Sequence, residues 1–499
     1  MKYGTGLLLA LIMLSAPGQS TAQGEGERRS VDLTIYNQNL ALVREERFFA
    51  FKRGMSRIVV PDIPATIDGT SVHFLSLSDP RGVSVVEQNY QYDLVHQAKL
   101  LERYLGKTVE FVRTTPDQKS EYTVSGKLLS TGYVSQPGYG GVPNYNYAGG
   151  MVAEVNGKIE INPAGRLVLP SLPEGLILRP QLEWLVNAAK DGSHRTEVSY
   201  LAGALSWSCN YVVLLAKDGA KLDLTGWVTL TNNSGTTFKD AGLKLAAGDV
   251  NIVRERMERS LGMAKVAMDA SEVQQQFKQS DLFEYKLYSL QRRTDLKNNE
   301  TKQIELTSAR DAASRKVFIY DGVGDQWHSW HLNSYSYRNQ GSFGQESNPK
   351  VGVFVTFRND EKSGLGLPLP KGKVRVYQRD QDGKEQFVGE DQIDHTPKDE
   401  ELRLYLGNAF DIVGERAQKD FRSMAGGRIV EETFEIKVRN HKAEPVEVLV
   451  YEHPWRWSQW EMLNASTEWT KVDQTTIKFP VRLKKDEQKS IRYTIRYSW

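Results

Sequence analysis

The chain has a single cysteine among its 499 residues, so no disulfide can form within it. Stability must therefore come from packing, for which 10 Trp, 22 Tyr and 17 Phe supply large apolar areas. Cys209 shares one face of an expected strand with Trp207 and Tyr211. This pattern indicates a small buried hydrophobic side chain rather than a nucleophile.

Charge of one sign is also lacking: 64 Lys and Arg oppose 62 Asp and Glu, which gives a net charge of +2. No field of one sign favours nucleic acid, so we expect no nucleic-acid partner. Outside the N-terminus, no apolar run approaches the roughly 18 residues of a membrane-spanning helix. We therefore expect no stable transmembrane helix, and no pattern indicates an oligomeric state.

Motifs of the common enzyme classes are missing: there is no Gly-x-Ser-x-Gly elbow, phosphate loop or dinucleotide fingerprint. His328 and His331 lie three apart, and on a strand they would point to opposite faces. His395, near Glu390 and Asp391, could belong to an acid–base site, but a loop histidine bonded to polar neighbours is favoured. The sequence thus predicts no catalytic residue, no metal and no cofactor.

Residues 1–22 have the features of a secretory signal peptide. Lys2 gives a positive start, Leu7 to Leu14 form a short apolar core, and Ser20-Thr21-Ala22 supply small residues before Gln23. No cysteine lies near this cleavage point, which excludes lipid anchoring there. We expect a mature protein that is exported, soluble, and periplasmic or extracellular.

A period of two dominates the rest of the chain and predicts a mostly β fold. It is clearest from residue 197 to 251, where three alternating segments, 207–215, 221–231 and 241–247, suggest an antiparallel meander. Asp218-Gly219 and Ser234-Gly235 supply the positive-φ positions of the turns between them. Asn156-Gly157 predicts a further two-residue hairpin.

The predicted architecture is antiparallel sheets and sandwiches, with a small barrel-like insert, a few helices and a C-terminal immunoglobulin-like sandwich. Its parts are the signal peptide 1–22; an N-terminal β-region 31–196 with helix 93–105 and insert 107–169; the central meander 197–310 with a helical or mobile excursion 253–277; and the C-terminal β-sandwich 311–499.

Several short motifs in the second half occur in a recognisable order. They are Leu205-Ser206-Trp207, Leu224-Thr225-Gly226-Trp227, Phe238-Lys239-Asp240-Ala241, Gly364-Leu365-Gly366-Leu367-Pro368, Val374-Arg375-Val376-Tyr377, Ala409-Phe410-Asp411-Ile412, Val438-Arg439-Asn440 and Glu452-His453. From Val198 to Trp499 the chain resembles an exported bacterial family whose C-terminal domain of unknown function is shared with mucoidy-inhibitor-like proteins. The resemblance implies an envelope-associated β-protein, and it implies no particular chemistry.

Two aromatic clusters are candidate ligand-binding surfaces. The first is a loop with Tyr139, Tyr145 and Tyr147, which could stack on sugar rings or a peptide but is favoured as a flexible loop. The second contains Trp455 and Trp457, which would share a face of an extended segment. An aromatic corner that closes the final sandwich is the favoured interpretation there.

The leading hypothesis is a binding or scaffolding protein of the cell envelope that contacts protein or polysaccharide, without enzymatic activity. One alternative is a hydrolase acting on envelope glycan or peptide, with a site assembled from distant strands. A second alternative is an outer-membrane β-barrel, because Ile491, Tyr493, Ile495, Tyr497 and the terminal Trp499 alternate.

Overall fold

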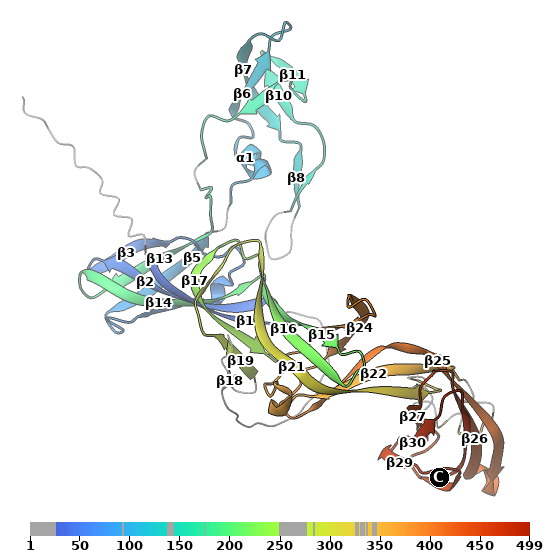
Figure 1. The fold of residues 1–499 in the computed structure, drawn as a ribbon. Helices are drawn as coiled ribbons and strands as arrows, with labels where there is room; N and C mark the ends of the chain where they lie inside the picture. Colours follow the sequence, from blue (N-terminus) through green and yellow to red (C-terminus); the bar gives the residue numbers. More distant parts are fainter. Residues whose placement is uncertain are drawn as a thin grey trace, which may run out of the picture.

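The computed structural model describes residues 26–91, 94–136, 144–173, 175–248, 277–282, 285–324, 329, 335, 338–341 and 347–499. Strands dominate these residues, and they form several sheets that extend along one elongated body (Figure 1). The predicted mostly β fold is therefore confirmed. The signal segment 1–22 and residues 253–276 of the predicted excursion lie outside the described residues.

The N-terminal part is built from two packed sheets. The larger has the order β18 (Phe277–Leu282), β19 (Tyr285–Leu290), β17 (Phe238–Ala247), β1 (Glu27–Tyr36), β2 (Leu40–Phe51), β14 (Gly192–Gly203), β4 (His73–Ser76), with β20 (Thr294–Leu296) on β17. The smaller has the order β3 (Gly54–Val60), β13 (Gln181–Ala188), β5 (Val83–Gln91). The buried Trp184 joins them, with its ring 6.1 Å from that of Phe49 and 5.2 Å from that of Phe74.

An insert projects from this part, away from the rest of the body (Figure 1). Its sheet has the order β11 (Lys158–Ile161), β10 (Val152–Val155), β7 (Glu121–Ser130), β6 (Thr108–Thr114), β12 (Arg166–Val168), and beside it lie helix α1 (Gln97–Arg103) and the hairpin of β8 (Tyr133–Gln136) and β9 (Asn144–Tyr147). The hairpin turn at Asn156 (φ 50°) and Gly157 (φ 72°) is as predicted. The barrel-like closure is wrong, because the described sheet is open, with β11 and β12 as its edges.

Helix α1 is shorter than the predicted span 93–105. His96 precedes its first turn, and the His96 Nδ1 accepts a hydrogen bond from the Lys99 N–H at 3.4 Å. Elsewhere in the described residues lie short 3₁₀ segments at Gly69–Ser71, Glu361–Ser363 and Ala425–Gly427. Within the described part of the chain, no helix combines the length and apolarity needed to cross a membrane.

The predicted meander is correct for two strands and wrong for the third. Strands β15 (Leu205–Leu215) and β16 (Lys221–Asn232) form an antiparallel hairpin, with Gly219 at φ 71° in the turn. Strand β17 instead leaves this sheet and runs parallel to β1 in the N-terminal one. Alternation shows which face of a strand is buried but not which strand lies next to it, so the sequence pattern could not reveal this crossing.

The crossing is fixed by Asn232, at the end of β16. Its side chain is fully buried, and its Nδ2 donates to the carbonyls of Thr236, Leu296 and Lys297 at 2.9–3.1 Å. Its Oδ1 accepts from the N–H and the hydroxyl of Ser234. The Asn232 side-chain amide thus supplies hydrogen-bond donors to backbone carbonyls at the point where the chain crosses between the two sheets. Without it these carbonyls would lose this donor.

The second half of the chain is organised by a 13-stranded sheet. Its order is β24 (Glu385–Ile393), β23 (Gly372–Arg379), β15, β16, β21 (Glu300–Asp321), β22 (Lys350–Arg358), β25 (Glu401–Met424), β26 (Ile429–Asn440), β31 (Gln488–Ser498), β28 (Trp460–Ala465), and β27 (Val446–Glu452), β30 (Thr476–Leu483) and β29 (Thr470–Asp473) join it through β21. Its C-terminal strands fold into two layers. Tyr493 of β31 lies 5.6 Å from the rings of both Phe434 and Phe479, so the predicted C-terminal β-sandwich is present.

Two predicted boundaries fall inside continuous strands. The division at 196/197 lies within β14, and that at 310/311 lies within β21. Strand β21 pairs with β16 as far as Ala313 and with β22 from Ser314 onward. Strand β21 therefore runs without a break from the central region into the C-terminal region, and it is hydrogen-bonded in both.

Replacing Asn232 by Ala should lower the free energy of unfolding by about 2 kcal/mol or more, because buried carbonyls lose their donor. Urea unfolding followed by tryptophan fluorescence measures the change. Asn233→Ala is the matched control: Asn233 is exposed, so its effect should stay within about 0.5 kcal/mol. Equal effects of the two substitutions would contradict this role for Asn232.

Candidate functional site

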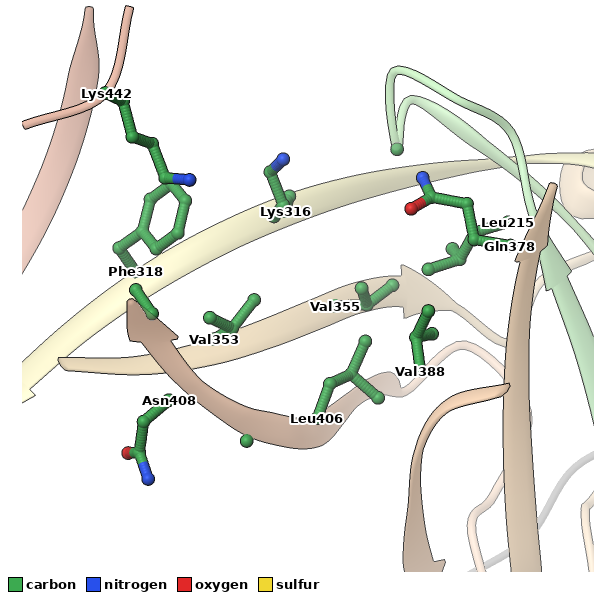
Figure 2. Close-up of a pocket in the computed structure, with 13 residues that line it drawn as sticks. Leu215, Lys316, Phe318, Val353, Val355, Gln378, Val388, Leu406, Asn408 and Lys442 are labelled. Atoms are coloured by element: carbon green, nitrogen blue, oxygen red, sulfur yellow. The ribbon is translucent and has the colours of Figure 1, made fainter. Parts of the chain in front are cut away.

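A groove lies where the central strands meet the C-terminal sandwich (Figure 2), and we call it the junction groove. Its volume is about 270 Å³. It is lined by Leu215, Gly219, Lys316, Phe318, Val353, Val355, Gln378, Val388, Leu406, Gly407, Asn408, Ala409 and Lys442. These residues come from seven separate segments of the chain, so only the folded structure brings them together.

An irregular stretch of β25 shapes one wall. Gly352 of β22 pairs with Asn408, whereas Lys350 pairs with Val413, so residues 409–412 of β25 lie opposite Val351 alone. Gly407, which pairs with Val353 shortly before this bulge, has φ 125°, a conformation that glycine tolerates and other residues rarely adopt. Bulges of this kind bend a strand and are frequent beside functional sites.

The end of the groove away from Lys442 is formed by the hairpin of β23 and β24, which contributes Gln378 and Val388 (Figure 2). This hairpin approaches β25 very closely at Gly389, where a Cβ would lie only 2.7 Å from the carbonyl oxygen of Leu406. Gly389 thus permits the contact that closes this end of the groove.

The floor is apolar and belongs to both hydrophobic cores. Leu215 and Val355 are part of the larger core, against which Leu406 packs. Phe318 is part of the C-terminal core, against which Val353 packs. The groove is therefore the seam between two packed interiors.

The rim carries two ammonium groups. The Nζ atoms of Lys316 and Lys442 lie 5.7 and 5.9 Å from the centroid of the Phe318 ring. Lys442 also lies 3.7 Å from the Asp411 carboxylate, a partly exposed pair that contributes little stability. None of the thirteen lining residues is an acid, a histidine, a cysteine or a serine.

The predicted tyrosine loop has two different environments in its described part, and Tyr139 lies outside it. Tyr145 packs on α1: its hydroxyl donates to Glu102 at 2.5 Å, and its ring lies 5.1 Å from that of His96. Tyr147 is 68% exposed and packs edge-on against Tyr133. Tyr147 is therefore the tyrosine of this pair that offers its ring to a ligand.

The predicted tryptophan platform is largely inside the protein. Trp455 is only 1% exposed, and its ring contacts the buried guanidinium of Arg456 at 4.4 Å. It offers no face to a glycan. Trp457 is partly buried against the C-terminal core, packs edge-on against Trp499, and has the Arg338 guanidinium over its ring. The aromatic corner, favoured from the sequence, describes this arrangement.

The other sequence candidates do not meet in the groove. The His395 Nδ1 accepts a hydrogen bond from the Lys371 N–H at 3.2 Å, and Glu390 pairs with Lys373 and Arg375. His328 and His331 lie outside the described residues, within which no cluster of three potential metal ligands occurs. Cys209 is buried, and burial raises the pKa of its thiol to about 12, as expected of a packing residue.

Sequence reasoning missed a buried ionic cluster in the C-terminal sandwich. Arg416 Nε lies 3.0 Å from both carboxylate oxygens of Glu452, which also accepts from the Tyr493 hydroxyl at 2.5 Å. A second pair joins Arg456 to Glu432 at 2.6 Å. A signal was available, because Glu432 and Glu452 occupy the apolar phase of strands that otherwise alternate regularly.

Comparison with known proteins yields no relative: no protein-family model and no curated protein matches the chain. The resemblance of Val198–Trp499 to the exported family thus stays a prediction.

Asp321 lies near the buried ionic cluster of the C-terminal sandwich. It accepts hydrogen bonds from the N–H groups of Val323 and Gly324 and lies 3.0 Å from Nε2 of His453, the residue after Glu452. Burial alone would raise the pKa of Asp321, but His453 and these N–H donors hold it below its ordinary value of 3.8. Because the folded-state pKa is depressed, the carboxylate stabilises the fold above that ordinary value, and this stabilisation is lost as pH falls through the folded-state pKa.

Asp321→Asn should therefore lower the urea midpoint of unfolding at about pH 6, and its difference from the native protein should shrink toward zero below about pH 3. The midpoint is measured by fluorescence across this range. The exposed Asp486, changed to Asn, serves as the control and should leave the midpoint nearly unchanged throughout. A difference for Asp321→Asn that is independent of pH would show that the carboxylate charge is not responsible.

Proposed function

We propose that this protein is exported to the bacterial cell envelope, where it binds and scaffolds a protein or polysaccharide partner. The observation that supports this proposal is the lining of the junction groove. It has an apolar floor and two lysines, and it contains no carboxylate, histidine, cysteine or serine for proton transfer or nucleophilic attack. A hydrolase would need carboxylates, a histidine or a nucleophile to converge there. The groove supports binding rather than bond cleavage.

An exposed aromatic side chain beside the groove provides an anchor for the partner. Phe410, on the β25 bulge next to the lining residue Ala409, is 95% exposed. An isolated phenylalanine so fully in water contributes nothing to the packing of its own chain. Aromatic side chains of this kind often dominate the binding energy of protein interfaces.

Phe410→Ser should weaken binding of the mature protein to isolated envelopes of the source bacterium by about tenfold or more, since loss of an anchor costs roughly 2 kcal/mol. Stability should not change, because the ring is already exposed. Cosedimentation with a labelled protein measures binding. Val472→Ser, which alters another exposed apolar residue far along the chain in β29, is the matched control.

The same samples test the alternative function. Release of soluble glycan or peptide should not exceed that of envelopes alone. Release that grows with time and with protein concentration would favour the hydrolase and contradict the scaffold. Identical binding by Phe410→Ser and the native protein would remove Phe410 from the interface.

Export predicts a specific mature N-terminus. Expression of the full chain in a Gram-negative host should yield a protein that lacks residues 1–22 and begins at Gln23, which intact-mass spectrometry measures. Replacing Leu11 by Arg in the apolar core should block export and leave the chain uncleaved, whereas Leu11→Ile should not. An uncleaved native protein retained inside the cell would refute the proposed location.

A further inference from the structure

We infer that the junction groove binds a single-chain amphiphilic anion, with its apolar chain on the groove floor and its acidic head beside Lys316 and Lys442. This goes beyond the proposed binding of a protein or polysaccharide partner, because it assigns a separate small ligand to the groove itself. It follows from the charge, surface chemistry and size of the groove.

The sign of the head group follows from the rim. Both lysine Nζ atoms lie within 6 Å of the same phenyl ring, so their fields overlap at one place. Among the described residues, no ion pair is recorded for Lys316, and Lys442 has Asp411 at 3.7 Å, whose carboxylate is not part of the lining. The lining itself therefore carries positive charge only. A carboxylate or phosphate is favoured there, and a cation is disfavoured.

The apolar body follows from the floor. Figure 2 shows Val353 and Val355 on β22, Leu406 on β25, and Val388 and Leu215 at the far end, away from Lys442. These are branched aliphatic side chains, which suit an acyl chain and cannot stack on sugar rings as aromatic faces do. Cations at one side and aliphatic groups along the floor match the two ends of an amphiphile.

The number of acyl chains in the ligand follows from the volume of the junction groove. At about the 30 Å³ that one water occupies in the liquid, the 270 Å³ of the groove holds roughly nine heavy atoms. That is the body of one medium-length chain and too little for two. A two-chain lipid would leave most of its apolar surface in water.

The test uses four probes with chains of about ten carbons, each kept below its micelle concentration: decanoate, decyl phosphate, decyl maltoside and decyltrimethylammonium. Isothermal titration calorimetry with the mature protein measures the affinities. Both anions should bind at least about tenfold more tightly than the neutral and cationic probes. Shortening decanoate to octanoate should weaken binding by roughly fourfold or less per methylene, according to how deeply the chain is buried.

Lys316→Met and Lys442→Met retain the apolar stems and remove the charges, so each should weaken anion binding about three- to tenfold and leave the neutral probe unaffected. Lys239→Met, at an exposed site on β17, is the matched control and should behave as the native protein does. Circular dichroism confirms that each variant is folded.

Equal affinity for all four head groups would overturn the anionic assignment while leaving the groove as a binding site. Absence of binding by every probe would overturn the ligand class altogether, whereas the envelope interaction is judged separately by Phe410→Ser. Preference for anions that persists in the Lys316→Met, Lys442→Met double variant would show that the head group lies elsewhere.

Discussion

Two strands that pass through both halves of the molecule are the constraint on which the rest depends. Strand β21 pairs with β16 and then with β22 and β27, and β25 pairs first with β22 and then with β26. Each contributes to a hydrogen-bonded ladder on both sides of the junction. The two cores are therefore linked by two continuous strands, each of which is hydrogen-bonded in both halves. The groove exists because β25 bulges where it passes from one half to the other.

Each core also contains a carboxylate held by arginine and tyrosine. In the N-terminal sheets, Glu45 accepts from Arg47 at 2.7 Å and from Tyr200 at 3.1 Å. In the C-terminal sandwich, Glu452 is held in the same way by Arg416 and Tyr493. A buried pair adds little net stability, but removing one partner costs about 3–5 kcal/mol. A slip of one residue in register would separate these partners, so such clusters discriminate against misaligned sheets that an aliphatic core would tolerate.

The sequence predicted strands and turns well because both are local properties. Alternation located β15 and β16, and Asn156-Gly157 located a hairpin. Partner choice is not local: the pattern of β17 fits either sheet, and the carbonyls bound by Asn232 lie as far away as Lys297. The groove could not be predicted for the same reason. Its lining residues, such as Lys316 and Val388, come from strands far apart in the sequence, and neither departs from the pattern of its own strand. Trp455 was a candidate for ligand binding alongside the favoured aromatic corner, because an aromatic cluster in the sequence does not show whether its rings face inward. The structure decides for the corner, with this ring buried.

The position of the groove between two packed cores affects how it can bind a ligand. A pocket formed by a mobile loop must be ordered when its ligand arrives, and that ordering reduces the affinity. Here the floor consists of β21, β22 and β25, whose side chains Phe318 and Val355 are already packed. Only the lysine side chains on the rim must be ordered. A preformed aliphatic floor with adaptable charges at one end fixes the apolar body of a ligand while tolerating different acidic heads. Selectivity in this groove therefore arises from the length and number of apolar chains more than from the identity of the anion.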